Sequence, residues 1–215
     1  MVNVATVNQS GAAGELLSPI DFYFDFSSPY GYLASELIDA VGARHGRRVV
    51  WHAVLLGAAF RATGGQPPSQ QPIKGDYFRQ DFLRSARFHD IPLRMPVGFP
   101  VSSLHAARSF NWLGQQDEAL ARRFAHAVFR AYFTAERPID QLDTVLDIAR
   151  SLDIDRAALA EALTTQSLKD ATRLDNDRAL ARGVFGSPFF IVDGESFWGV
   201  NRLPQLERWL SEGGF

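Results

Sequence analysis

A strand that runs directly into a helix is the feature that most restricts how this chain can fold. Residues 20–26, IDFYFDF, carry Ile or Phe at every second position, which is the pattern of a β-strand. Ser28-Pro29 follows, and apolar side chains then recur at helical spacing as far as Gly46. A second strand is predicted within residues 47–56, RRVVWHAVLL. Because a crossover of about 20 residues lets the two strands run parallel, we expect a right-handed β-α-β unit.

The middle of the chain has a different character. Residues 61–77 are rich in Gly, Pro and Gln and indicate an exposed excursion. From residue 77 to residue 182 the apolar spacing is almost all helical, apart from the proline-containing stretch 91–101. The chain therefore carries a block of helices, whose candidate N-caps are Ser102, Asp117, Asp140 and Asp155.

Strand character returns near the end of the chain. PFFIV and SFWGV flank Asp193-Gly194, a strong β-hairpin signal, and LPQLERWLSE follows as an amphipathic helix. The order β-α-β, helices, β-β-α predicts an α/β fold in which a helical block interrupts a small mixed sheet. The expected parts are a disordered extension at residues 1–17, a sheet domain at residues 18–62 plus 179–215, and an inserted all-helical domain at residues 63–178.

Composition excludes several classes of function. The 22 basic and 24 acidic residues leave a net charge of −2 with no long basic run, which disfavours nucleic acid and anionic membranes as partners. The chain has no cysteine, so it has no disulfide, no thiolate metal site and no thiol redox chemistry of its own. The first 20 residues lack the features of a signal peptide, and no run of about 18 apolar residues occurs. We therefore expect a soluble cytoplasmic protein.

Ser28, at the strand-to-helix junction, has two interpretations. As an N-cap, its hydroxyl would accept a hydrogen bond from a free N–H of the first helical turn. Alternatively, the N–H groups of this turn would hold an anion. A phosphate loop needs several glycines and Gly31 stands alone, whereas a thiolate must come from a ligand because the chain has no cysteine. The residues alone leave both interpretations open.

The junction also resembles a known active site. A strand, then Cys-Pro-x-Cys, then a helix is the active site of DsbA-like thiol oxidoreductases of the thioredoxin fold, and Ser28-Pro29-Tyr30-Gly31 matches it with serine at the first cysteine. In this it is similar to kappa-class glutathione transferases and, more closely, to 2-hydroxychromene-2-carboxylate isomerases. VLLGAAFRATGGQPP, KGDYFRQD and GVFGSPFFIVDGESFWGVNRL agree with the isomerases, so the resemblance extends over residues 18–212. It implies a thioredoxin-like fold with an inserted helical domain.

The resemblance implies a role for each matched residue. Ser28 would be the catalytic serine, whose hydroxyl donates to the sulfur of bound glutathione, with Ser27 as the alternative one position away. Ser187-Pro188 would contain a cis-proline that faces the active site. Asn201 stands where the family typically has Asp, so it would bind the γ-glutamyl end without a charge. The implied glutathione-binding residues are Lys74, at the glycyl carboxylate, and Ser187, Pro188, Val200 and Asn201.

The function that the resemblance implies is a glutathione-dependent isomerase, commonly a homodimer. It would interconvert 2-hydroxychromene-2-carboxylate, or a close aromatic analogue, and trans-o-hydroxybenzylidenepyruvate in aromatic hydrocarbon breakdown. A kappa-type glutathione transferase and a non-catalytic glutathione-binding protein are the alternatives, whereas a disulfide oxidoreductase is excluded because cysteine is absent. No metal is expected, since the histidines lack ligand spacing. Candidate contacts for the small aromatic carboxylate substrate are Arg84, Arg87, Trp112 and His105.

Overall fold

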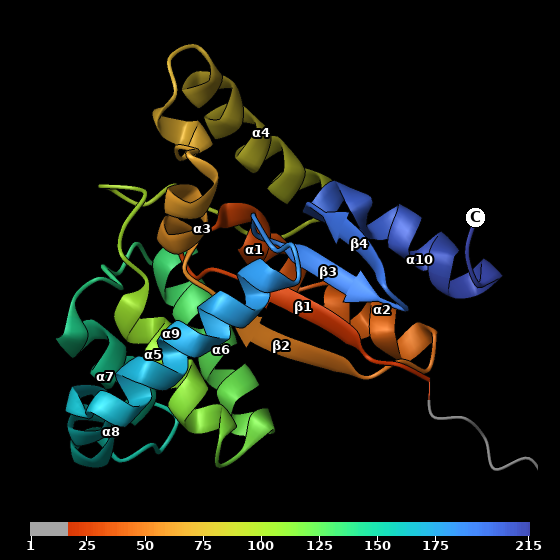
Figure 1. The fold of residues 1–215 in the computed structure, drawn as a ribbon. Coiled ribbons are helices and arrows are strands. Elements are labelled where there is room, and N and C mark those ends of the chain that lie inside the picture. The colour runs from red at the N-terminus through yellow and green to blue at the C-terminus, as the bar shows by residue number, and fades with distance from the viewer. Residues whose placement is uncertain (1–16) are drawn as a thin grey trace, which may run out of the picture.

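The computed structural model describes residues 17–215 of the chain (Figure 1). The disordered extension expected at residues 1–17 lies, apart from Leu17, outside the described residues. β1 and β2 are parallel, and β3 is antiparallel to both of its neighbours, which confirms the mixed sheet and the parallel β-α-β unit. The strands β1 (Ile20–Phe24), β2 (Val49–Ala53), β3 (Phe189–Val192) and β4 (Glu195–Trp198) form one sheet in the order β2-β1-β3-β4.

Helices lie between the strands of this sheet and after the last one. In the first half lie α1 (Pro29–Ser35), α2 (Ile38–Arg44), α3 (Leu56–Thr63) and α4 (Lys74–Phe88). The helical block continues with α5 (Leu104–Gly114), α6 (Glu118–Phe133), α7 (Leu142–Arg150), α8 (Arg156–Thr164) and α9 (Gln166–Ala181). Two short 3₁₀ turns, η1 (Pro68–Gln70) and η2 (Val200–Arg202), precede α4 and the last helix, α10 (Leu203–Glu212).

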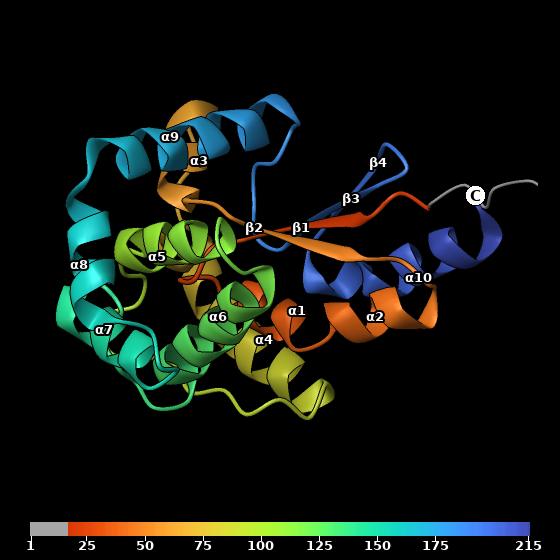
Figure 2. The ribbon, with the colours of Figure 1, turned by 90° about the horizontal axis from the view of Figure 1, so that it is seen from below.

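Both faces of β1 are covered. Figure 2 shows the sheet from its edge, with α9 on one side and α1, α2 and α10 on the other. Phe22 and Phe24 are fully buried in the cluster on one face, and Tyr23 is buried with Ile191 and Ala179 on the other. The alternation along β1 therefore separates two buried faces, because α9 covers the side that carries Tyr23.

An aromatic cluster joins the sheet to the helical block. The ring of Phe24 lies 5.3 Å from that of Phe110 in α5 and 5.6 Å from that of Phe129 in α6. Phe26, just after β1, lies 5.0 Å from Phe129. Aromatic pairs at these distances add to the free energy gained by burying their area. The buried residues on the Phe22–Phe24 face of the sheet and those of the helical block that pack against it form one continuous hydrophobic cluster.

Two segments of the first half differ from the sequence pattern. The helix expected from Pro29 to Gly46 breaks at Glu36 and Leu37 into α1 and α2, and the Glu36 carboxylate turns towards α6. The second strand ends earlier than expected, at Ala53. The apolar residues that follow it begin α3, so part of the expected excursion is helical.

The turn and cap predictions have mixed outcomes. Asp193 and Gly194 both adopt positive φ angles, 52° and 84°, between β3 and β4, which confirms the hairpin. Asp117 and Asp155 cap α6 and α8 through their side chains. The other two N-cap predictions were wrong by one position: α5 starts after Ser103 and α7 after Gln141, in place of Ser102 and Asp140, and neither makes a side-chain cap.

Glu36 connects α1 to α6 through a partly buried ion pair. Its carboxylate accepts hydrogen bonds from Arg130, at 2.7 Å, and from His126, at 3.3 Å. Burial by itself raises the pKa of the Glu36 carboxyl, but the bonds from His126 and Arg130 outweigh burial and hold this pKa at about 2. A lowered carboxyl pKa gives stability that is present above the usual value of 4.5 and is lost as the pH falls towards 2.

We expect Glu36→Gln to lower the free energy of unfolding by about 2 kcal/mol at neutral pH, allowing for solvent screening. The difference from the wild type should shrink between pH 4.5 and pH 2, because the wild-type carboxylate takes up a proton there. Urea unfolding across this range measures the effect. Glu212→Gln, which removes an exposed pair with Arg208, should cost less than about 0.5 kcal/mol. Equal costs for the two substitutions would contradict the assignment.

Candidate active site at the start of the first helix

Ser28 lies between the end of β1 and the start of α1. It is the N-cap of α1, and its Oγ accepts a hydrogen bond from the Gly31 N–H at 3.0 Å. The same hydroxyl donates to the backbone carbonyl of Ser187 at 3.0 Å. Since Ser28 is only 5% exposed, both bonds are shielded from solvent. The Ser28 hydroxyl therefore caps α1 as an acceptor, as the cap interpretation predicts. As a donor, it bonds to a residue near the end of the chain.

The segment that faces Ser28 comes from just before β3. The Ser187–Pro188 peptide bond is cis, the geometry that the resemblance implies. The Ser187 hydroxyl accepts a hydrogen bond from the Asp25 N–H at 2.9 Å. A side chain at Gly31 would place its Cβ 2.7 Å from the Ser187 Oγ and 3.1 Å from the Ser28 Cβ. Only glycine at this position lets α1 and the cis-proline segment approach so closely.

Asp25 ties the junction to α3. This carboxylate is almost fully buried, and its Oδ1 accepts hydrogen bonds from the Ser27 N–H at 2.7 Å and the Ser27 hydroxyl at 2.8 Å. Its Oδ2 accepts one from the Leu56 N–H, at the start of α3, at 2.7 Å. The Ser27 hydroxyl is thus committed to Asp25, whereas Ser28 makes its bonds at the meeting point of α1 and the cis-proline segment.

One cavity beside Ser28, of about 490 Å³, contains most of the expected glutathione-binding residues. We call it the Trp198 cavity, because the exposed ring of Trp198 forms one wall together with Phe185, 4.8 Å away. A Cβ on Gly186 would lie 2.2 Å from the Trp198 Nε1, so the indole can occupy this place only beside glycine. From the expected set it is lined by Ser28, Ser187, Val200 and Asn201.

The opposite wall of the Trp198 cavity belongs to α1 and α4. The Tyr30 hydroxyl donates to the Asp81 carboxylate, which also accepts a hydrogen bond from Arg84 at 2.6 Å. Burial and the bond to Asp81 raise the pKa of Tyr30. Burial raises the pKa of Asp81, but the bonds from Arg84 and Tyr30 outweigh it and lower this pKa. Tyr30 is therefore a fixed neutral donor and not a base.

A second cavity meets the first at Ser28. It has a volume of about 480 Å³, and we call it the Arg61 cavity, since Arg61 is the only Lys or Arg among the described residues that line it. Ser27, Ser28 and Asp25 lie at its inner end, and Phe60 and Phe99 are among its apolar walls. Of the described residues that line both cavities, which are Ser28, Leu56, Phe60, Pro68 and Phe82, Ser28 alone has a polar side chain. A group held in one cavity can therefore meet a group held in the other beside this hydroxyl.

Several expected residues lie elsewhere. Lys74 is exposed at the start of α4 and lines neither cavity, although Tyr77 and Phe78, one turn further on, line the Trp198 cavity. Arg84 is bound to Asp81 and also lies outside both linings. The same is true of the other candidate substrate contacts, Arg87, Trp112 and His105.

Sequence reasoning missed Asp25, Arg61, Tyr30 and Trp198. Asp25 could have been found from its spacing to Ser27, because an Asp side chain that binds the N–H two residues on is a recognised turn. Arg61 and Trp198 carried no such signal, since they reach the site only through the placement of α3 and β4.

Within residues 17–215, no group of three or more His, Asp or Glu side chains is arranged to hold a metal ion. In the same part of the chain, none of the helices has the length and apolar character needed to cross a membrane.

Comparison with known proteins gives consistent matches. The family model of the DsbA-like thioredoxin domain matches residues 19–211. A 2-hydroxychromene-2-carboxylate isomerase of Sphingobium xenophagum is 31% identical over 193 residues, which cover 89% of this chain and 97% of the relative. A glutathione S-transferase kappa 2 of Caenorhabditis elegans is 29% identical, with 90% and 92% of the two chains covered. A solved structure of a 2-hydroxychromene-2-carboxylate isomerase superimposes with a TM-score of 0.81 at 28% identity, covering 90% of this chain and 94% of that one.

We expect Asp25→Asn to lower the free energy of unfolding by about 2 kcal/mol, because an amide cannot accept from all three donors and leaves one buried N–H or O–H unpaired. Urea unfolding measures the change. Asp177→Asn, an exposed change of the same chemistry in α9, serves as the control and should stay within about 0.5 kcal/mol of the wild type. An Asp25→Asn protein as stable as the control would show that Asp25 does not hold the junction together.

Proposed function

Because this chain belongs to the 2-hydroxychromene-2-carboxylate isomerase family of DsbA-like thioredoxin domains, we propose that it is a glutathione-dependent isomerase. Its substrate would be 2-hydroxychromene-2-carboxylate or a close aromatic analogue, and its product trans-o-hydroxybenzylidenepyruvate or the matching analogue. The reaction would belong to aromatic hydrocarbon breakdown. We also propose that the protein is a cytoplasmic homodimer.

The observation that carries the proposal is the position of Ser28 where the two cavities meet. An enzyme that joins a bound thiol to a second molecule needs two adjacent cavities and a hydrogen-bond donor between them. The Trp198 cavity and the Arg61 cavity have the sizes of small-molecule sites. Ser28 is the residue of the expected site that lies in both.

The residues of the Trp198 cavity fit glutathione. Gly186 lets the Trp198 indole pack against the backbone, and this indole forms a flat wall beside the polar groups of the cavity. Ser28, Ser187, Val200 and Asn201 offer hydroxyl, backbone and amide groups along one wall, which suits a small tripeptide. The Asn201 amide would bind the γ-glutamyl end, and the Lys74 side chain would reach the glycyl carboxylate from the start of α4.

Ser28 would favour the ionised form of the thiol. A thiol with a pKa of about 8.5 is only a few per cent ionised at neutral pH, and lowering this pKa by two units requires about 2.7 kcal/mol. A hydrogen bond to a charged group contributes about 1.5–3 kcal/mol. To supply it, the Ser28 hydroxyl would turn its proton from the Ser187 carbonyl, 3.0 Å away, to the sulfur, while Oγ keeps its bond from the Gly31 N–H.

Bound glutathione would supply a thiol whose reversible addition to a conjugated system turns a double bond into a single one, so that rotation and isomerisation can follow. The chain would contribute binding and orientation. The apolar walls of the Arg61 cavity would hold the aromatic ring and exclude water from the sulfur. The Arg61 guanidinium would bind the substrate carboxylate, since an arginine matches the geometry of that group.

A kappa-type glutathione transferase is the second candidate, favoured by the kappa relative at 29% identity. It would use Ser28 and the Trp198 cavity in the same way but release the thioether. A conjugate that accumulates with chlorodinitrobenzene, without turnover of the chromene, would support it. A non-catalytic glutathione-binding protein would show neither reaction, and Ser28→Ala would then lower only stability, by about 1 kcal/mol.

We expect Ser28→Ala to slow glutathione-dependent chromene isomerisation about 10- to 100-fold, because the sulfur loses a hydrogen bond to its charged form. The rate should also move to higher pH, where the thiol ionises unaided. Steady-state rates across a pH series measure both effects. Ser27→Ala is the matched control, because the Ser27 hydroxyl donates to Asp25. A Ser28→Ala rate equal to that of the wild type, in a folded protein, would reject the assigned role.

We expect Arg61→Ala to raise the KM for the chromene carboxylate roughly fivefold, the value of one exposed ion pair. The KM for glutathione should not change, because Arg61 does not line the Trp198 cavity. Arg61→Lys should recover part of the loss. Arg79→Ala, in α4 and outside both linings, is the control. If Arg61→Ala left the KM for the chromene unchanged, the carboxylate would have to bind elsewhere.

A further inference from the structure

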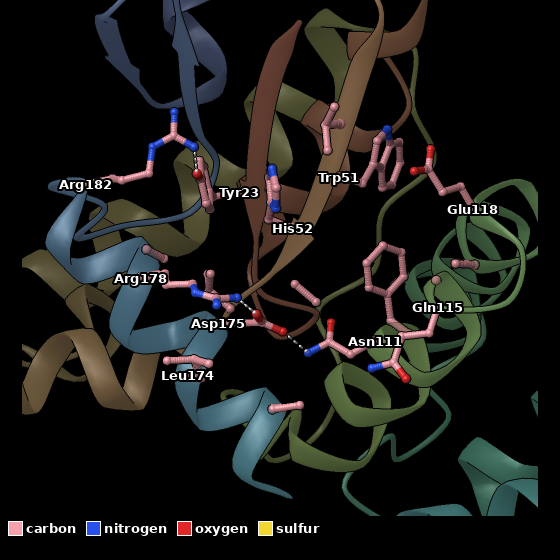
Figure 3. Close-up of a pocket in the computed structure, with 18 of the residues that line it drawn as sticks. Tyr23, Trp51, His52, Asn111, Gln115, Glu118, Leu174, Asp175, Arg178 and Arg182 are labelled. Carbon is pink, nitrogen blue, oxygen red and sulfur yellow. Dashed lines mark hydrogen bonds and ion pairs between the residues drawn. The ribbon is translucent and has the colours of Figure 1, made fainter. Parts of the chain in front are cut away.

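A third cavity is lined by none of the residues of the expected site. Its volume is about 810 Å³, larger than either cavity at Ser28, and it shares no lining residue with them. It follows the edge of β2, between α9 on one side and α5 and α6 on the other (Figure 3). We call it the edge cavity, after Trp51 and Ala53 of that strand edge.

The free edge of β2 supplies backbone donors and acceptors to this cavity. Val54, just past β2, donates its N–H to the Phe24 carbonyl. The backbone N–H and C=O groups of the even-numbered residues of β2 therefore point towards β1. Val49 directs its carbonyl the other way, where it accepts a hydrogen bond from Arg122. Trp51 and Ala53 face that same way by the alternation of a strand, and their backbone groups have no partner there among residues 17–215. Buried polar groups of this kind are normally satisfied by water or a ligand.

Two arginines face the cavity from the opposite side, Arg178 in α9 and Arg182 at its C-cap. Arg178 and Arg182 are four residues apart, so their side chains lie on the same face of the helix segment. Arg182 is held by Asp21, at 2.8 Å, and by the Tyr23 hydroxyl. Arg178 is 68% exposed, and its contact with Asp175 is long, at 3.5 Å. Figure 3 shows Arg178 and Asp175 close together on α9, with Arg182 further along.

The acidic residue beside Arg178 is held at a distance, because the contact between the two side chains is 3.5 Å long. Burial raises the pKa of Asp175, although Arg178 and His52 act in the opposite direction. Its other contact, from the Asn111 side-chain amide, is also 3.5 Å long. The Arg178 guanidinium therefore keeps most of its capacity to bind an anion.

A flat aromatic surface lies next to the arginines. The rings of Tyr23 and His52 are stacked, with centroids 4.5 Å apart and planes 17° apart. The His52 side chain is 35% exposed, so its outer side is accessible from the cavity. Phe110 lines the wall on the α5 side. A ring placed here would extend the Tyr23–His52 stack with its anionic group towards α9.

We propose that the edge cavity binds a small planar aromatic carboxylate, at a site separate from Ser28. The carboxylate pairs with Arg178 and Arg182, the ring stacks on His52, and ring substituents bond to the free backbone groups of Trp51 and Ala53. A peptide strand is disfavoured, because only these two residues offer a free edge and both are less than 10% exposed, at 7% and 3%. The volume matches that of a small-molecule site.

The test is isothermal titration of salicylate, with neutral salicylamide as the matched probe. The protein carries Arg61→Ala, so that binding in the Arg61 cavity is weakened. We expect Arg178→Ala to weaken salicylate binding about tenfold, the loss of one charge-assisted pair. Arg173→Ala, an exposed change of the same charge in α9 and outside the cavity, should leave the affinity unchanged. Salicylamide should bind about tenfold more weakly than salicylate and be insensitive to Arg178→Ala.

Four results would overturn the proposal. They are no salicylate binding to the Arg61→Ala protein, equal affinity of that protein with and without Arg178→Ala, equal losses from Arg178→Ala and Arg173→Ala, and a crystal in which salicylate lies only beside Ser28. Sedimentation provides a further check. A dimer that Arg178→Glu separates into monomers would mean that a second copy of the chain covers the edge cavity, which also rejects the ligand site.

Discussion

The hydrogen bond from the Ser28 hydroxyl to the Ser187 carbonyl joins residues that are 159 positions apart. It brings the end of β1 against the segment before β3, on either side of the whole helical block. The bond from the Asp25 N–H to the Ser187 hydroxyl reinforces it, and the Asp25 carboxylate extends the connection to α3. The two cavities also share the apolar residues Leu56, Phe60, Pro68 and Phe82, and this arrangement places the Ser28 hydroxyl on the border between them. Buried bonds of this kind hold geometry well, because breaking one leaves an unpaired polar group.

The helix that begins after Ser28 is shorter than the sequence pattern indicates. Its dipole therefore contributes less, relative to the Ser28 hydroxyl, to the stabilisation of a bound thiolate. A helix that ran from Pro29 to Gly46 would place a substantial dipole at the sulfur, but α1 ends at Ser35. The hydroxyl of Ser28 and the local N–H groups of the first turn must therefore supply more of the stabilisation of a thiolate. The proposed chemistry thus depends mainly on one hydroxyl, which already has an acceptor in Ser187 that a thiolate would replace.

Local signals predicted the elements that depend on neighbouring residues. The alternation of residues 20–26, the Asp193-Gly194 turn and the caps at Asp117 and Asp155 all follow from short-range chemistry, and all are found. At the break between α1 and α2, Glu36 bonds to Arg130 in α6, far along the chain, and no local pattern contains this contact. The same reason explains why Arg61 and Trp198 were missed, while Ser28, Ser187, Val200 and Asn201 were identified through resemblance and then found along one cavity. Lys74 matched the same resemblance, yet it lies outside that lining because the residues around it form the exposed start of α4.

The aromatic cluster that unites Phe24, Phe110 and Phe129 has a consequence for engineering. The helical block looks like a removable module along the chain, since it is inserted between two halves of a sheet. Its rings, however, interlock with those of β1 in a single hydrophobic cluster. A chimera that received this block from a relative would expose or overfill that cluster unless the matching strand residues were transplanted with it. To exchange substrate preference between two relatives, the recombination points would therefore have to lie within the segments that form the Arg61 cavity. The aromatic cluster would then come from one parent alone.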